Sequence, residues 1–175
     1  MKNIDATLEK LYGKNALSTQ RERYQKAEKT FGELFGDAEN AMIFSASGRT
    51  EIGGNHTDHN RGKVLAAAVS LDVIAFVVPT DDGIITVKSE GFPQDTVDTS
   101  DLSVCEEDKN TSAALIRGVA DGMSRNGFSV GGFKAYTTSS VLKGSGISSS
   151  AAFEVLIGTI LSHLYNSGNV GAVKI

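Results

Sequence analysis

The chain has 175 residues, of which 40% are hydrophobic, and its 17 basic and 21 acidic side chains give a formal net charge of -4. This composition predicts one globular domain over residues 1–175 with a sizeable core. It argues against a nucleic-acid partner, since no long basic run occurs, and against a membrane partner, since no apolar stretch could cross a bilayer. A lone cysteine, Cys105, and no secretory signal at the start favour a cytoplasmic protein.

Hydrophobic periodicity predicts helices and strands that do not alternate strictly, which is typical of an α+β fold. Thr19 and Glu22 have the spacing of a capping box at the start of the second helix. Pro79 is expected to end the second strand, and residues 81–83 to turn the chain into the third. Residues 92–109 are predicted as loop with a strand fragment. The predicted helices cover 1–13, 19–34, 110–125 and 151–165, and the predicted strands 41–44, 71–78, 84–87 and 133–139.

The most informative motif is Val-Leu-Lys-Gly-Ser-Gly-Ile-Ser-Ser-Ser-Ala-Ala, residues 141–152, between a predicted strand and a predicted helix. Gly144 and Gly146 let the backbone approach a ligand closely, and the free N–H groups of a helix start favour an anion such as phosphate. The serine hydroxyls add donors and oxygen ligands for Mg²⁺. A flexible loop followed by a serine N-cap is the alternative. A Walker A loop is excluded because no Gly-Lys-Ser/Thr ending occurs, and Ser149 stands where a dinucleotide fingerprint needs glycine.

A second motif, residues 46–62, reads Ala-Ser-Gly-Arg-Thr-Glu-Ile-Gly-Gly-Asn-His-Thr-Asp-His-Asn-Arg-Gly between two apolar runs. His56, Thr57 and Asp58 offer hydrogen-bond donors and acceptors within a few residues, which suits a ligand with several hydroxyls, such as a sugar. One alternative is a solvated polar loop. Another is a metal site formed by His56, Asp58 and His59, which no cysteine or further histidine cluster supports.

Together, the two motifs resemble those of the galactokinase family, in the GHMP kinase superfamily. Residues 48–60 are similar to the family's Gly-Arg-Val-Asn-Leu-Ile-Gly-Glu-His-Thr-Asp-Tyr-Asn, and residues 144–152 to the superfamily phosphate loop. The resemblance implies a two-layer α+β GHMP-kinase N-terminal domain, a mixed sheet with helices packed on one face. It also implies that the C-terminal lobe, with the catalytic base, is absent. No Asp or Glu follows Glu154, so we expect an N-terminal fragment that is inactive alone.

The activity implied by the resemblance is transfer of a phosphoryl group from ATP to galactose, giving galactose 1-phosphate. Arg49 would stabilise charge on the transferring phosphate, and Ser150 would bind Mg²⁺. A surface salt bridge is the alternative for Arg49, and helix capping is the alternative for the serines. The implied sugar-binding residues are Asn55, His56, Thr57 and Asp58, and the implied nucleotide-binding residues are Ser89, Gly144, Ser145, Gly146, Ile147, Ser148, Ser149 and Ser150.

Several positions depart from the family pattern. Asn55 stands where the family usually has a glutamate that binds the sugar, which puts the identity of the sugar in doubt. His59 replaces a tyrosine, Leu142 replaces a proline, and Ser112 and Leu115 stand where aromatic residues are common. These departures leave open a second function, a non-catalytic sugar- and nucleotide-binding sensor built on the galactokinase scaffold.

Overall fold

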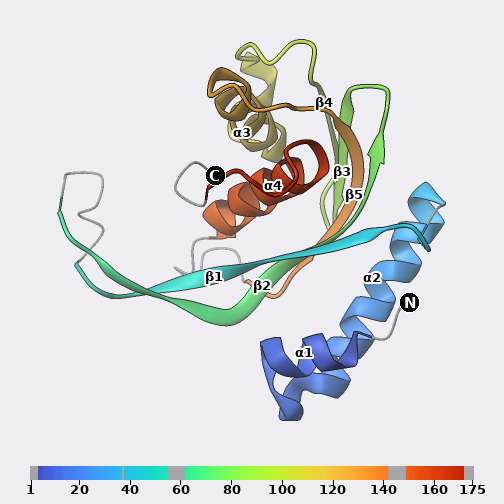
Figure 1. Ribbon diagram of the computed structural model, residues 1–175, viewed down its shortest axis with the longest axis vertical. Coiled ribbons are helices and arrows are strands. Elements are labelled where there is room, and N and C mark those ends of the chain that lie inside the picture. The colour runs from blue at the N-terminus through green and yellow to red at the C-terminus, as the bar shows by residue number, and fades with distance from the viewer. Residues whose placement is uncertain (1–3, 37, 55–61, 142–148, 172–175) are drawn as a thin grey trace.

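A mixed five-stranded sheet organises the protein (Figure 1). The structure is a computed structural model that describes residues 4–36, 38–54, 62–141 and 149–171. The strand order is β1-β2-β5-β3-β4, and all neighbours are antiparallel except β3 and β5, which are parallel. The strands are β1 (Met42–Gly53), β2 (Leu65–Thr80), β3 (Ile84–Ser89), β4 (Gln94–Asp98) and β5 (Gly132–Ser139).

Helices cover both faces of this sheet. Because successive strand residues point to opposite faces, Val73, Ala75 and Val77 of β2 join the core under α3 and α4, whereas Ile74 and Phe76 join the core under α1 and α2. The predicted α+β class and mixed sheet are confirmed, and α3 and α4 form the helix layer expected on one face. The helices α1 and α2 form a layer on the other face. The sequence did not predict this second layer, because the two-layer expectation left the other face of the sheet without helices. The helices are α1 (Asp5–Tyr12), α2 (Leu17–Phe35), α3 (Ser112–Arg125) and α4 (Ser149–Tyr165), and short 3-10 turns cover Lys14–Ala16 and Glu106–Asp108.

Two local predictions were wrong. Pro79 lies inside β2, paired with Phe133 of β5, and does not end the strand. The register of β2 with β1 starts at Val77, so Pro79 lies where a strand has an open side and a missing N–H is tolerated. The capping box at Thr19 also fails: α2 starts at Leu17, directly after a 3-10 turn, and no side chain caps it. Thr111 instead caps α3, accepting a hydrogen bond from the Ala114 N–H.

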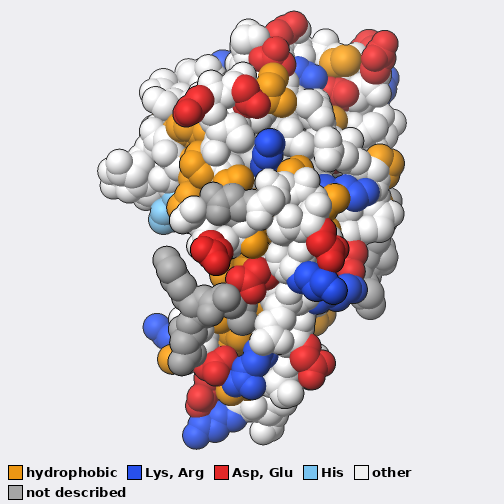
Figure 2. Space-filling model, turned by 90° about the vertical axis from the view of Figure 1, so that its right-hand side faces the viewer, with side chains coloured by type: hydrophobic (Ala, Val, Ile, Leu, Met, Phe, Trp, Pro, Cys, Tyr) orange, Lys and Arg blue, Asp and Glu red, His pale blue; other side chains and the backbone are white. Residues whose placement is uncertain are grey.

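The outer surface mixes charges of both signs. On the face shown in Figure 2, acidic and basic side chains alternate with hydrophobic ones. Ion pairs of exposed or half-buried side chains include Arg21–Asp5 at 2.7 Å and Lys26–Glu90 at 2.8 Å. Among the described helices, none combines the length and hydrophobicity needed to span a membrane.

Candidate functional site

Arg49 lies on the long hairpin formed by β1 and β2, which extends beyond the helical layers and curves away from them (Figure 1). Arg49 pairs with Ala68, and the register shifts between Ser47 and Arg49. Such a shift bends a strand and re-aims the side chains beside it. The Arg49 side chain is half-buried. The sequence predicted a strand only over residues 41–44 and gave a polar loop as one alternative for residues 46–62, whereas the first eight of these belong to β1.

The far end of the hairpin is closed at Gly54. This residue has φ +116°, a conformation that favours glycine. A Cβ atom at Gly54 would lie 2.6 Å from the carbonyl oxygen of Lys63 and 2.7 Å from the Cα of Val64. The two strand ends therefore approach each other more closely than any side chain at position 54 would allow. The predicted sugar-binding residues Asn55, His56, Thr57 and Asp58, and His59 of the alternative metal site, lie outside the described residues.

The strand β5 leads toward the predicted phosphate loop at its carboxyl end. The Ser139 hydroxyl accepts a hydrogen bond from the Val141 N–H at 3.1 Å, and Val141 is buried. The helix α4 then begins at Ser149, with Ser150 exposed in its first turn. The free N–H groups and the macrodipole of this helix start favour an anion, which fits the predicted role of Ser149 and Ser150. Gly144, Ser145, Gly146, Ile147 and Ser148 lie outside the described residues.

Ser89 lies at the same end of the sheet as the start of α4. Because β3 and β5 are parallel, their carboxyl ends meet at one edge, and the Thr137 hydroxyl of β5 donates to the Ser89 hydroxyl at 2.9 Å. The next residue, Glu90, is held by Lys26 and by the Thr138 hydroxyl, and these two hydrogen bonds lower the pKa of its carboxyl group. The structure thus brings Ser89 close to the carboxyl end of β5. Arg49 lies on β1, which pairs with β2 in the long hairpin.

Sequence reasoning missed Asp72, a carboxylate that is only 3% exposed in the middle of β2. It forms an ion pair with Arg23 of α2 at 2.7 Å. The available signal was a lone aspartate inside the predicted strand 71–78, because aspartate is depleted from strands and is rarely buried without a partner. Among the described residues, no group of three His, Cys, Asp or Glu side chains has the arrangement of a metal site.

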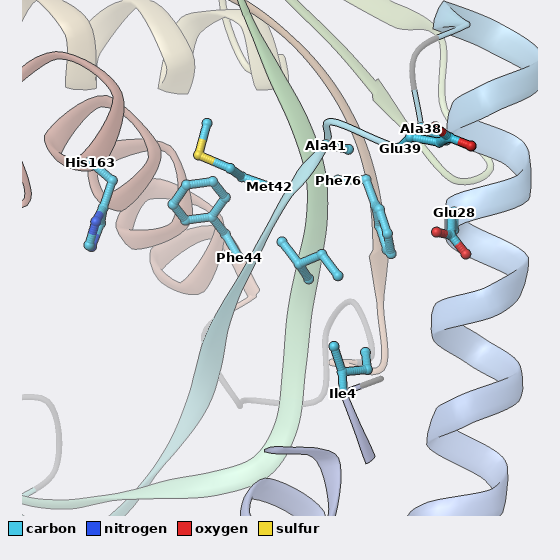
Figure 3. A pocket seen from close by; sticks show the side chains of 10 residues that line it. Ile4, Glu28, Ala38, Glu39, Ala41, Met42, Phe44, Phe76 and His163 are labelled. Atoms are coloured by element: carbon cyan, nitrogen blue, oxygen red, sulfur yellow. The ribbon is translucent and has the colours of Figure 1, made fainter. Parts of the chain in front are cut away.

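A groove lies at the start of β1, between α2 and the last turn of α4 (Figure 3). Its walls include Phe44 and His163, whose rings meet edge to face with centroids 5.8 Å apart, together with Met42 and Phe76. Arg49, Ser89 and the start of α4 do not line this groove. It is therefore separate from the candidate site.

Comparison with solved structures identifies the fold. The protein has the fold of GHMP kinases, similar to the mevalonate kinase of Methanococcus jannaschii, with 15% identity and a TM-score of 0.59 over 73% of this chain and 41% of that chain. It is also similar to a D-glycero-D-manno-heptose 1-phosphate kinase from Bacteroides thetaiotaomicron, with 20% identity and a TM-score of 0.59 over 76% of this chain and 45% of that chain.

Within this class, the resemblance to galactokinases is confirmed. Residues 29–79 match the galactokinase galactose-binding signature. The structure of Lactococcus lactis galactokinase complexed with galactose matches with a TM-score of 0.78 and 24% identity, over 86% of this chain and 39% of that chain. The chain therefore carries the galactokinase signature on a GHMP-kinase fold and spans about two-fifths of the length of the structures it matches.

Proposed function

We propose that the protein is a cytoplasmic sugar kinase of the galactokinase type, which transfers the γ-phosphoryl group of ATP to the anomeric hydroxyl of galactose. The observation that carries this proposal is the galactose-binding signature over residues 29–79, which contains Arg49 and every residue pair between β1 and β2. The chain spans about two-fifths of the length of the structures it matches, so this activity is proposed for the full-length protein.

Different side chains of the candidate site would bind the transferring phosphate of ATP and the sugar. Catalysis of phosphoryl transfer depends mainly on positioning and on charge stabilisation. Arg49 is half-buried on a paired strand, and its guanidinium is always charged and can bind two oxygens at once. It would therefore stabilise charge on the transferring phosphate. Asn55, His56, Thr57 and Asp58 would bind the sugar hydroxyls.

The nucleotide would lie at the start of α4. Residues 144–150 would surround the phosphates, and Ser89, at the adjacent carboxyl end of β3, would border the nucleotide. The Ser150 hydroxyl is exposed in the first helical turn, which suits an oxygen ligand for Mg²⁺. When bound, Mg²⁺ would neutralise charge on the phosphates. A structure with a similar fold supports the choice of ATP as the nucleotide. The Streptococcus pneumoniae phosphomevalonate kinase, solved in complex with phosphomevalonate and AMPPNP, matches this fold with a TM-score of 0.51.

A second candidate is a sensor that binds sugar and nucleotide without transfer. Asn55 favours it, because an amide replaces the family's charged sugar ligand. To separate the two, ADP release by the full-length protein should be followed with ATP and a panel of sugars, with Arg49→Ala as control. A kinase gives galactose-dependent turnover on the scale of about 1–100 s⁻¹ that the variant loses. Binding of both ligands without turnover would contradict the kinase and support the sensor.

A further inference from the structure

Asp72, which is buried in β2, is the centre of a polar cluster that joins β2 to four other segments of the chain. Its Oδ1 accepts a hydrogen bond from Arg23 Nη1 of α2 at 2.7 Å. Its Oδ2 accepts hydrogen bonds from the Tyr12 and Ser45 hydroxyls, both at 2.5 Å, and the Ser140 hydroxyl lies 3.4 Å from Oδ1. These partners come from α1, α2, β1 and the exit of β5. A carboxylate buried in this way needs such partners to offset its desolvation.

The backbone of Asp72 takes part as well. Its N–H donates to the Ser140 hydroxyl at 3.0 Å, and its carbonyl accepts from the Ser140 N–H at 2.9 Å. Arg23 Nη2 donates to the carbonyls of Asp72 and Thr138, at 3.0 and 3.1 Å. One guanidinium on α2 thus connects β2 to the last residues of β5.

The cluster lies where both predicted motifs leave the sheet. Asp72 is paired with Ser47, two residues before Arg49, and the regular register is interrupted directly after this pair. Ser140 precedes the buried Val141, the last described residue before the predicted phosphate loop. Regular pairing is interrupted between Ser47 and Arg49 and resumes with Arg49 and Ala68. Directly before this interruption, the side chain of Asp72 connects Ser45 of β1 to Ser140, which follows β5.

We propose that Asp72 is a positioning residue, which holds the strand of Arg49 in a set geometry relative to the exit of β5 that leads to the phosphate loop. This inference rests on the proposed kinase function. Stability alone does not require an ion pair here, because apolar residues of similar volume often stabilise a protein equally well or better. A buried carboxylate that accepts hydrogen bonds from four segments instead restricts the positions of these segments relative to one another. Phosphoryl transfer is sensitive to such restriction, since a misplacement of about 1 Å can cost about 100-fold in rate.

The test compares three variants of the full-length protein. Asp72→Asn removes the charge and keeps the side-chain shape. Arg23→Met/Asp72→Asn also removes the guanidinium, so no buried charge is left without its partner. Asp108→Asn is the matched control. Asp108 forms an ion pair with Arg117 of α3 at 2.8 Å, and the two side chains are 20% and 17% exposed. The helix α3 packs against β4, which lies at the opposite edge of the sheet from β1. The measurements are kcat, KM for galactose and ATP, melting temperature, and hydrogen exchange of residues 42–53 and 139–141.

We expect Asp72→Asn to lower kcat by about 10–100-fold and to accelerate exchange in both segments. The double variant should regain melting temperature without regaining kcat, whereas Asp108→Asn should keep the wild-type kcat and exchange in these segments. Recovery of kcat together with melting temperature in the double variant, or unchanged exchange in Asp72→Asn, would overturn the proposal. If the wild type shows no turnover, the proposed function fails, and hydrogen exchange alone decides whether Asp72 holds the two segments.

Discussion

Replacement of Gly54 by alanine tests whether the closed end of the hairpin shapes the sugar site. At φ +116°, a side chain is strained, and the new Cβ would lie 2.6 Å from the Lys63 carbonyl oxygen and 2.8 Å from Val64 Cγ1. Because Lys63 contributes a backbone atom, the strand ends must separate. Positive-φ strain alone costs a non-glycine residue about 1–3 kcal/mol. If the whole of this free energy is lost from galactose binding at the adjacent Asn55, the affinity for galactose falls by about 5–150-fold.

The matched control is Gly53→Ala. Gly53 pairs with Leu65 in the hairpin, and a Cβ there would meet no atom within 4 Å. Titration calorimetry of the full-length protein should show weaker galactose binding for Gly54→Ala, little change in ATP binding, and wild-type values for Gly53→Ala. Wild-type galactose affinity in Gly54→Ala, or an equal loss in Gly53→Ala, would refute the reasoning.

Three further predictions concern single side chains. Arg49→Ala should lower kcat more than it raises KM, because its charge acts mainly in the transition state, and Arg49→Lys should recover only part of the loss; an unchanged kcat would remove Arg49 from the mechanism. Asn55→Glu should tighten galactose binding by about 1 kcal/mol through charged hydrogen bonds, and complete loss of binding would contradict the assigned sugar contact. Burial and the hydrogen bond to Asp72 raise the pKa of Tyr12, so the unfolded chain loses this proton at a lower pH than the folded protein. The free energy of unfolding should therefore fall as the pH rises above about 10, and fall less steeply in Tyr12→Phe; an equal slope in both proteins would argue against this link.

The sequence predicted most helices and strands but underestimated the hairpin. Hydrophobic periodicity located α3, β5 and α4 to within a few residues, because each buries one face in the core. It missed residues 46–53, which are eight of the twelve residues of β1. Ala46 still packs in the core, but the far part of the hairpin extends away from the helices (Figure 1), and Thr50, Ile52 and Gly53 are exposed, so burial imposes no apolar alternation there. A polar stretch with glycines then resembles a loop, although backbone pairing with β2 makes it a strand.

In the candidate site, too, some residues could be found from the sequence and others could not. Arg49 and the start of α4 could be chosen as candidates because each lies in a motif that is local in sequence, whereas Ser89 was named only through the family resemblance. The role of Asp72 was not, because its partners Tyr12, Arg23, Ser45 and Ser140 are 27 to 68 residues away in the chain. The pairing of β2 with β1 and β5 brings Ser45 and Ser140 to Asp72, and the packing of α1 and α2 against the sheet brings Tyr12 and Arg23. Lone polar residues within predicted core strands are therefore worth examining for buried clusters.

The most direct test of the proposed function is to identify the product by phosphorus NMR. The full-length protein should be incubated with Mg²⁺, ATP and either galactose or an analogue that lacks the anomeric hydroxyl. The account predicts that galactose 1-phosphate forms from galactose and that the analogue gives no sugar phosphate, although it binds. Binding of galactose without any phosphorylated sugar, or phosphorylation of the analogue at another hydroxyl, would contradict the assignment.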